Sequence, residues 1–212
     1  MLSVTDVYQK LLAYYGNQHW WPADSDYEML IGAILTQNTN WRNVEKAFAS
    51  LGDKLNPQSI LQLEQSQLAQ LIRSAGYHNQ KAERIKLFTQ WFSRYNYDVN
   101  QLKIMPLEQL RVMLLSLKGV GKETADCMLV YAFDKPSFVI DAYTRRLFSR
   151  IGFDVPKNYD DFRIFIERSI PEQLSVYNEF HALIVVHAKM HCLAKPICLG
   201  CPLEKGCEQN VK

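Results

Sequence analysis

Four cysteines near the end of the chain have a spacing that can bind a metal. Cys192, Cys198, Cys201 and Cys207 follow the pattern C-x5-C-x2-C-x5-C. Four thiolates in so compact a segment can enclose one tetrahedral metal ion or an iron–sulfur cubane. Structural zinc sites usually use closely spaced cysteine pairs, and here only Cys198 and Cys201 are that close. The wider outer gaps favour the larger [4Fe-4S] cluster, with zinc as the alternative.

A glycine-containing segment in the middle of the chain has the features of a phosphate-binding turn. It reads L-K-G-V-G-K-E-T-A over residues 117–125 and joins two segments of helical character. Gly119 and Gly121 allow a sharp turn and a close approach of the backbone to a ligand. The N–H groups at the start of the second helix favour an anion. The segment therefore predicts a seat for a DNA phosphate, with an ordinary turn between two helices as the alternative.

Asp141 is a third candidate, because it precedes a predicted helix over residues 142–150 and can cap it. It is the single acid within residues 135–150. The basic residues of that stretch are Lys135, Arg145, Arg146 and Arg150. Such a local cluster can bind phosphate although the whole chain has a net charge of only +2, and a solvated helix face is the alternative.

The elements that position these residues are predicted to be helices. The 212 residues are 48% hydrophobic, and no stretch shows the sustained alternation of a half-buried strand. Apolar spacing predicts helices over 4–15, 27–36, 41–51, 59–63, 67–73, 80–95, from Pro106 into the glycine turn, and over 124–133, 142–150, 159–170 and 173–187. In the 80–95 helix, an apolar stripe is expected inside, with Lys81, Arg84 and Lys86 on the other face.

The composition also bounds the cellular setting. No apolar run approaches the roughly 20 residues that span a bilayer, and the first helix is amphipathic rather than a signal peptide. We therefore expect no membrane association and a cytoplasmic, nucleoid-associated protein. In a reducing compartment, five cysteines argue against a disulfide framework. Cys127 is expected to be a buried small hydrophobe.

Together the motifs resemble the endonuclease III superfamily of helix-hairpin-helix DNA glycosylases. The resemblance rests on L-K-G-V-G-K-E-T-A-D, on V-I-D-A-Y-T-R-R and on the four-cysteine loop. I-L-T-Q-N-T-N at 34–40 and G-Y-H-N-Q-K-A at 76–82 look like the DNA-probing loops of that family. The motifs occur in the family order and extend over nearly the whole chain, which makes the combination more specific than any one of them.

The resemblance implies an all-α fold of two helical domains. One would be a six-helix barrel at 23–134 that contains the helix-hairpin-helix motif at about 107–133. The other would be discontinuous, 1–22 plus 135–212, and would carry a [4Fe-4S] cluster in the loop 192–207. The implied ligands of that cluster are Cys192, Cys198, Cys201 and Cys207. The implied partner is double-stranded DNA with a damaged base, bound by a monomer.

The resemblance also implies a reaction. Bifunctional members carry a lysine two residues after the second glycine, whose amine forms a Schiff base with the sugar, but this chain has Glu123 there. Lys122 is one residue earlier and so turned by about 100° around the helix. Base excision is therefore expected to use water, without strand cleavage. Asp141 matches the catalytic aspartate, which stabilises an oxocarbenium-like state and orients or deprotonates the water. Glu123 would contact the base or the water, or be an exposed first-turn glutamate.

The resemblance also implies which residues of this chain contact DNA. Gln37 would fill the stack vacated by a flipped base, and Tyr77 would be a second wedge. The full set of implied DNA-binding residues is Gln37, Asn38, Tyr77, His78, Gly119, Gly121, Lys122, Thr124 and Arg145.

W-W-P at 20–22 and the glutamate at the lysine position are similar to the monofunctional 3-methyladenine DNA glycosylase III class. Alkylated purines are positively charged, and an aromatic slot favours them by stacking and cation–π attraction. Trp21 and Trp41 are the candidates for this base pocket, with ordinary core tryptophans as the alternative. Some members of the class lack the cysteine loop, a departure that bears on the subclass.

Other functions stay open at this point. One is a bifunctional glycosylase/AP lyase of the endonuclease III type, acting on oxidised or mismatched bases, with Lys122 or Lys189 as the amine. Another is a glycosylase for mismatched or deaminated bases. A third is a non-catalytic helix-hairpin-helix DNA-binding protein with a cluster, which would have no need of Asp141.

Overall fold

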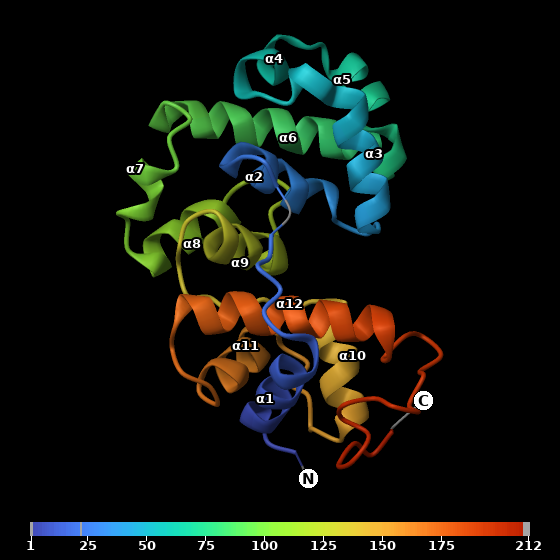
Figure 1. Cartoon of the computed structure of the whole chain (residues 1–212). Helices are drawn as coiled ribbons and strands as arrows, with labels where there is room; N and C mark the ends of the chain where they lie inside the picture. The colour runs from blue at the N-terminus through green and yellow to red at the C-terminus, as the bar shows by residue number, and fades with distance from the viewer. Residues whose placement is uncertain (1, 22, 210–212) are drawn as a thin grey trace. The chain divides into compact units, whose positions relative to one another are not determined.

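The computed structural model describes residues 2–21 and 23–209, and these residues form helices, turns and loops without a strand (Figure 1). The chain divides into two compact units, Met1–Trp21 with Pro136–Lys212 and Pro22–Lys135. The all-helical fold class expected from the sequence is confirmed for the described residues. None of their helices is long and apolar enough to cross a bilayer.

The unit of residues 22–135 is built around a buried helix. Its helices are α2 (Asp26–Leu35), α3 (Trp41–Leu51), α4 (Pro57–Gln62), α5 (Gln65–Leu71), α6 (His78–Phe92), α7 (Asn100–Lys103), α8 (Leu107–Leu115) and α9 (Lys122–Tyr131). α2 is apolar along most of its length and buries Leu30, Ile31 and Ile34 completely. It packs against α6 and α9, so the segments that leave its end lie near both of those helices.

Side-chain caps set where several of these helices begin. Ser25, Asn40 and Asn56 each accept a hydrogen bond from the backbone N–H three residues later, at the starts of α2, α3 and α4. Each cap satisfies a donor that the helix itself leaves unpaired.

The other unit contains α1 (Val4–Tyr15), α10 (Ala142–Ile151), α11 (Tyr159–Glu167) and α12 (Leu174–Met190). α12 packs against α1 and α10. The core of this unit is aromatic and aliphatic, and its fully buried members include Val7, Leu11, Phe148, Phe162 and Phe180. Cys192 and Leu203 from the cysteine segment belong to the same core, which ties that segment to the helices.

The observed helices agree with most of the predicted ones and differ at some ends. The ranges 4–15 and 41–51 are reproduced by α1 and α3. α6 starts two residues earlier than predicted and ends at Phe92, because residues 93–95 form a 3-10 turn and Asn96 is left-handed with φ of 52°. α7 was not predicted, because its four residues are too few to show a period.

Two predictions about single side chains have opposite outcomes. Cys127 is buried, as expected. The placement of Lys81 on the outer face of its helix is wrong, because Lys81 is only 1% exposed. Its ammonium group bonds to the backbone inside the unit instead.

Candidate functional site

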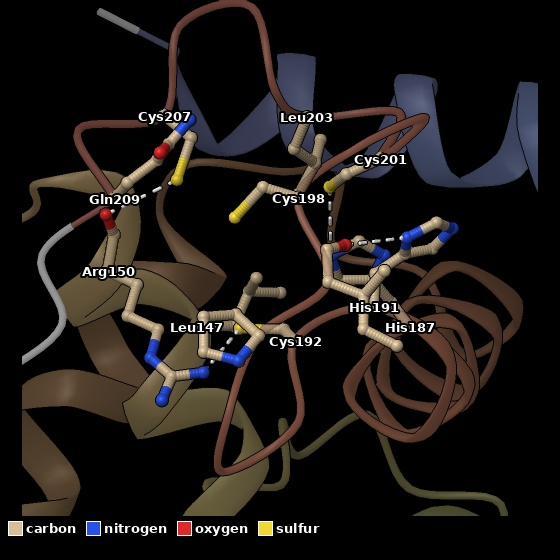
Figure 2. A pocket seen from close by; sticks show the side chains of 12 residues that line it. Leu147, Arg150, His187, His191, Cys192, Cys198, Cys201, Leu203, Cys207 and Gln209 are labelled. Carbon is tan, nitrogen blue, oxygen red and sulfur yellow. Dashed lines mark hydrogen bonds between the residues drawn. The ribbon is translucent and has the colours of Figure 1, made fainter.

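The four C-terminal cysteines line one pocket, together with apolar side chains such as Leu147 and Leu203. Figure 2 shows the sulfur atoms of the four cysteines gathered around this pocket. All four thiols are free. Within the described part of the chain, no three histidine, cysteine or acidic side chains form the compact group that holds a single metal ion.

Polar groups approach the cysteine sulfurs from α10 and α12. Arg150 Nη1 donates to Cys192 Sγ at 3.3 Å, and His187 Nε2 lies 3.7 Å from Cys201 Sγ. Burial and the neighbouring His191 lower the pKa of His187 to about 4, so its imidazole is neutral at pH 7. Burial and the neighbouring cysteines raise the thiol pKa of Cys201, with a backbone hydrogen bond acting against them. A bound cationic centre would offset both the burial of the thiolates and the repulsion between their negative charges. The four cysteines therefore fit a thiolate-ligated centre.

The arginines of the 135–150 cluster donate to backbone carbonyls of the protein, and each remains partly exposed. Arg146 Nε donates to the carbonyl of Cys192 at 2.9 Å, and Arg150 donates to the carbonyls of Leu193 and Ala194. Arg145 donates to the carbonyl of Pro156 at 2.8 Å. Phosphate binding by this cluster stays a prediction, and the observed contacts of Arg146 and Arg150 are with the cysteine segment. Sequence analysis missed their role as clamps on the cysteine segment.

Asp141 is the N-cap of α10, as predicted. Its Oδ1 accepts hydrogen bonds from the backbone N–H of Thr144 at 2.7 Å and from the Thr144 hydroxyl at 2.8 Å. Its Oδ2 lies 3.6 Å from His181 Nε2 on α12, and the Asp141 side chain is 13% exposed. Burial alone would raise the pKa of Asp141, but the contacts with His181 and Thr144 outweigh it and lower the pKa. The carboxylate is therefore ionised and held in one orientation at neutral pH.

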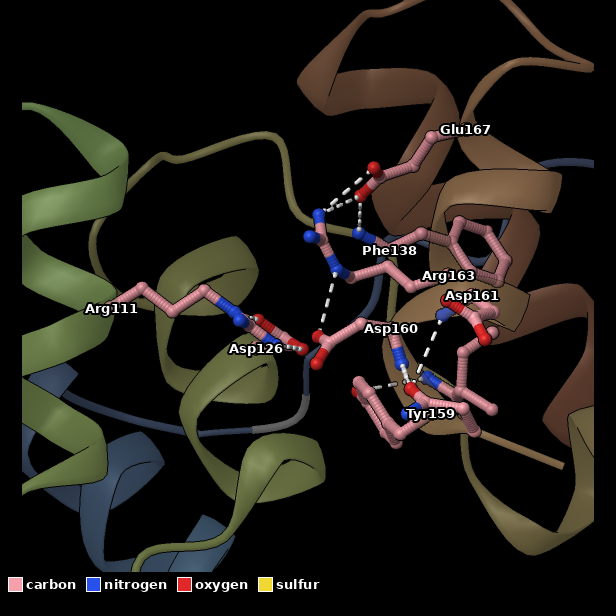
Figure 3. A network of polar contacts seen from close by, with 10 residues as sticks. Arg111, Asp126, Phe138, Tyr159, Asp160, Asp161, Arg163 and Glu167 are labelled. Atoms are coloured by element: carbon pink, nitrogen blue, oxygen red, sulfur yellow. Dashed lines mark hydrogen bonds and ion pairs between the residues drawn. The ribbon is translucent and has the colours of Figure 1, made fainter.

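The extended segment 138–140 that leads to Asp141 is anchored to α11. The backbone N–H of Phe138 donates to Glu167 at 2.8 Å, and that of Ile140 donates to the Tyr159 hydroxyl at 3.2 Å. Glu167 also accepts from Arg163 Nη1 on each of its two carboxylate oxygens, both at 2.9 Å (Figure 3). The two contacts of the extended segment with α11 have no sequence signature, because they join residues 29 and 19 positions apart.

The glycine turn joins α8 to α9. Val120 N–H donates to the Leu117 carbonyl at 3.0 Å, and Gly119 is left-handed with φ of 84°. A Cβ at Gly119 would lie 2.3 Å from the Arg84 side chain, so the turn needs glycine there. Gly121 has φ of −88°, and a Cβ there would meet nothing within 4 Å. The expectation that both glycines shape the turn therefore holds for Gly119, whereas Gly121 leaves open space beside the start of α9.

A buried ion pair joins the two helices on either side of this turn. Arg111 of α8 donates from Nε to Asp126 Oδ1 at 2.7 Å and from Nη2 to Oδ2 at 3.1 Å (Figure 3). Asp126 is fully buried on α9. Because both bonds of the fork are made, the pair sets the distance between the two helices.

Gln37 contacts the glycine turn from the end of α2. Its Nε2 donates to the Gly119 carbonyl and to Thr124 Oγ1, both at 2.9 Å, and its Oε1 accepts from Arg84 at 2.6 Å. The structure thus brings together three of the predicted DNA-binding residues, Gln37, Gly119 and Thr124. Lys122 is half-buried and Glu123 exposed in the first turn of α9. Sequence analysis missed Arg84, the partner that orients the Gln37 amide.

Two exposed residues of the predicted DNA-probing loops have left-handed backbones. Asn38 has φ of 53°, and Tyr77 has φ of 46° with 63% of its surface exposed. His78 begins α6 directly after Tyr77 and is half-buried. Left-handed conformations are unfavourable for most residues other than glycine, more so for tyrosine than for asparagine, and such strain is often found at functional sites.

The predicted base-pocket tryptophans lie in different units. Trp21 packs edge-on against Trp20, with ring centroids 5.9 Å apart, in the unit that contains residues 136–212. Trp41 begins α3 in the other unit and packs edge-on against Phe48 at 6.1 Å. Both rings are half-buried. Their pairing around a base stays a prediction.

Comparison with known proteins settles the family. Residues 31–172 match the family model of the HhH-GPD superfamily base excision DNA repair protein. The chain belongs to this family. It is therefore a DNA glycosylase of base excision repair, and the sequence-based resemblance to the endonuclease III superfamily is confirmed.

Relatives of this glycosylase span nearly its whole length. A protein of Methanocaldococcus jannaschii, provisionally named as a DNA repair glycosylase, is 45% identical and covers 95% of this chain and 94% of its own. Endonuclease III of Haemophilus influenzae is 30% identical over 89% of this chain and 86% of its own. The solved structure of H. pylori 3-methyladenine DNA glycosylase bound to 1,N6-ethenoadenine is 29% identical, with a TM-score of 0.76 over 89% of this chain and 98% of its own.

An endonuclease III–DNA complex supports the fold alone, since its identity is 24%. Its TM-score is 0.84 over 99% of this chain and 97% of its own.

Proposed function

We propose that this glycosylase is monofunctional and releases alkylated purines, such as 3-methyladenine, by attack of water at C1′. The observation that carries the proposal is the ionised carboxylate of Asp141, held at the N-terminus of α10. Its Oδ1 is occupied by Thr144, which leaves Oδ2, on the His181 side, as the freer oxygen.

Asp141 has the properties that departure of a purine requires. Breaking the glycosidic bond builds positive charge on the sugar, and a preoriented carboxylate stabilises that charge without having to reorganise. The same carboxylate can orient the attacking water or accept its proton. Because the lowered pKa keeps Asp141 ionised at neutral pH, its charge can stabilise the sugar and orient the water there.

Glu123 supports the monofunctional reaction. It lies exposed in the first turn of α9, where the resemblance to bifunctional glycosylases places their lysine. A carboxylate cannot form an imine with C1′. Lys122 precedes it by one position and so points about 100° away around the helix. Water is therefore the nucleophile in this proposal, and the DNA strand is left intact.

The preference for alkylated purines rests on two observations. One is the similarity to the H. pylori 3-methyladenine DNA glycosylase, whose structure contains ethenoadenine. The other is the set of half-buried tryptophans, Trp21 and Trp41, whose rings can stack on a cationic base. The remaining predicted DNA contacts, from Asn38, Tyr77 and His78 to Lys122 and Arg145, belong to the same proposal.

The cysteine pocket is proposed to hold a [4Fe-4S] cluster with Cys192, Cys198, Cys201 and Cys207 as ligands. Four free thiols line one pocket, and the Arg150 guanidinium beside Cys192 can balance the negative charge of a thiolate-ligated cluster. When bound, such a cluster supplies a rigid crosslink of the segment and a redox-active group. No step of base release is assigned to it.

The test is a base-release screen on duplexes with alkylated, oxidised or deaminated bases, with strand cleavage scored in parallel. We expect release of 3-methyladenine, intact abasic strands and no adduct after borohydride reduction. Glu123→Lys should introduce trapping by borohydride, and Glu123→Gln should not. Trapping of the wild-type protein would refute the monofunctional reaction and favour the alternative endonuclease III type lyase, which the 30% identity to the H. influenzae enzyme supports.

A further inference from the structure

α6 contains a lysine that is buried inside the unit of residues 22–135. Lys81 is 1% exposed, and lysines are almost never so buried without partners. Its Nζ donates to the carbonyl of Leu35 at 2.8 Å and to that of Ala75 at 2.7 Å. Both acceptors are backbone oxygens, so these two bonds of Lys81 fix the position of the main chain and do not form an ion pair.

The two acceptors lie where the two DNA-probing loops begin. Leu35 is the last residue of α2, and Thr36 to Asn40 follow it. Ala75 is the last residue of a 3-10 turn, and Gly76 and Tyr77 follow it. Carbonyl groups at helix ends lack partners within the helix and carry partial negative charge, so an ammonium group binds them well. One buried cation therefore holds the starting points of both loops.

Each loop then enters a conformation that needs support. Asn38 and Tyr77, one in each loop, have φ of 53° and 46°. A tyrosine persists in a left-handed conformation only when the surrounding structure holds it there, whereas asparagine adopts this conformation at lower cost. The backbone of Lys81 adds to this support, because its N–H donates to the Tyr77 carbonyl at 2.9 Å.

We propose that Lys81 is a positioning residue for lesion recognition, which sets the spacing between the Gln37–Asn38 loop and Tyr77. The proposal rests on the proposed function in that these loops probe DNA. Lys81 is not a catalytic residue, because its ammonium group is buried and both its bonds go to the backbone.

α6 offers a matched control five residues further along. Lys86 Nζ donates to the carbonyls of Leu61 at 3.1 Å and of Ile60 and Leu63, around the end of α4. It is also a lysine of α6 that satisfies helix-end carbonyls, but the chain after these acceptors enters α5 rather than a probing loop. Loss of Lys86 should cost stability without disturbing the loops.

The experiment compares Lys81→Met with Lys86→Met by amide hydrogen exchange of the DNA-free protein. Lys81→Met should increase exchange in 36–40 and 76–78, where the Thr39 and Gly76 amides are hydrogen-bonded in the native protein. Lys86→Met should leave exchange there unchanged. If Lys81→Met does not fold, Lys81→Gln is measured in the same way. Unchanged exchange in the Lys81 variant, or an equal increase in both variants, would overturn the positioning role.

Single-turnover base release supplies the functional test. A displacement of the loops by about 1 Å can slow a reaction up to about 100-fold, so Lys81→Met should slow release by about 10-fold or more at saturating enzyme. The affinity of Lys81→Met for undamaged duplex should stay within about 2-fold of wild type. The release rate and the duplex affinity of Lys86→Met should also stay within about 2-fold of wild type. A Lys81→Met rate equal to wild type would overturn the proposal. If the wild-type protein releases no base from any duplex, the proposed function fails, whereas the exchange comparison still decides whether Lys81 holds the loops.

Discussion

Replacement of Asp141 by asparagine separates two roles of this residue, the helix cap and the catalytic charge. Asparagine caps helices about as well as aspartate, and its Oδ1 can still accept from the Thr144 N–H and hydroxyl. What Asp141→Asn removes is the negative charge at the start of α10 and beside His181. A charge at a helix end contributes about 0.3–1 kcal/mol, so the free energy of unfolding should fall by no more than about 1 kcal/mol.

The catalytic effect should be much larger than the effect on stability. Loss of a positioned acid–base group typically slows a reaction by about 10²–10⁴-fold, equivalent to about 3–5 kcal/mol of transition-state stabilisation. Asp141→Ala should lose the same activity and, in addition, about 0.5–2 kcal/mol of cap stability. The control is Ser3→Ala, which removes the cap of α1 in the same unit, where the Ser3 side chain accepts from the Asp6 amide. It should lower stability without slowing base release.

The assay is single-turnover release of the base, paired with denaturant unfolding over a range of pH. Because the pKa of Asp141 is lowered by folding, its contribution to stability is present above its ordinary pKa of 3.8 and is lost as the pH falls through the folded value. The stability difference between wild type and Asp141→Asn should therefore shrink in acid. A variant that releases base at the wild-type rate would refute the catalytic role.

The remaining predictions concern the glycine turn, the buried lysine and the cysteines. Gly121→Ala should leave stability within about 0.5 kcal/mol but weaken DNA binding in a titration, whereas Gly119→Ala should also destabilise the fold, by at least about 1 kcal/mol, through its clash with Arg84 and its left-handed φ. Burial and the charge of Arg84 lower the pKa of Lys81 from 10.5 to about 8, so the unfolded state binds more protons between these values. As the pH is raised from about 8 to 10.5, the free energy of unfolding of the wild type should increase relative to that of Lys81→Met, by up to about 3 kcal/mol. Parallel pH profiles of the two proteins would contradict this. Cys201→Ala should lose iron and the absorbance near roughly 400 nm expected of a cluster, whereas Cys127→Ala, a buried cysteine outside the pocket, should retain both.

The helices and their caps could be predicted from the sequence because their causes are local. Apolar spacing and a cap residue lie within a few positions of the helix they define, as Asp141 does at the start of α10. The cysteine spacing is local in the same sense, and the four cysteines line one pocket.

The supporting contacts of the site could not be predicted in this way. Lys81 has the spacing of a surface residue, and only the tertiary approach of the Leu35 carbonyl, 46 positions away, makes its burial favourable. His181 lies next to Asp141 only because α12 packs on α10. Arg150 was part of a basic cluster in the sequence, and its role depended on which carbonyls the fold placed around it.

α10 links two features that the sequence presents as separate motifs. Asp141 caps its first turn, and Arg150 in its last turn donates to the sulfur of Cys192 and to the carbonyls of Leu193 and Ala194. The ten residues of this helix span about 15 Å and join the two features through one continuous helix. A change in the cysteine segment therefore has a physical path to the carboxylate, through the position of α10 and without any contact between them. A cysteine variant could therefore lose activity because α10 has shifted. Protection of the Thr144 amide, which donates to Asp141, from hydrogen exchange tests this: only a variant that keeps the protection and loses activity is evidence that the cysteines take part in base release.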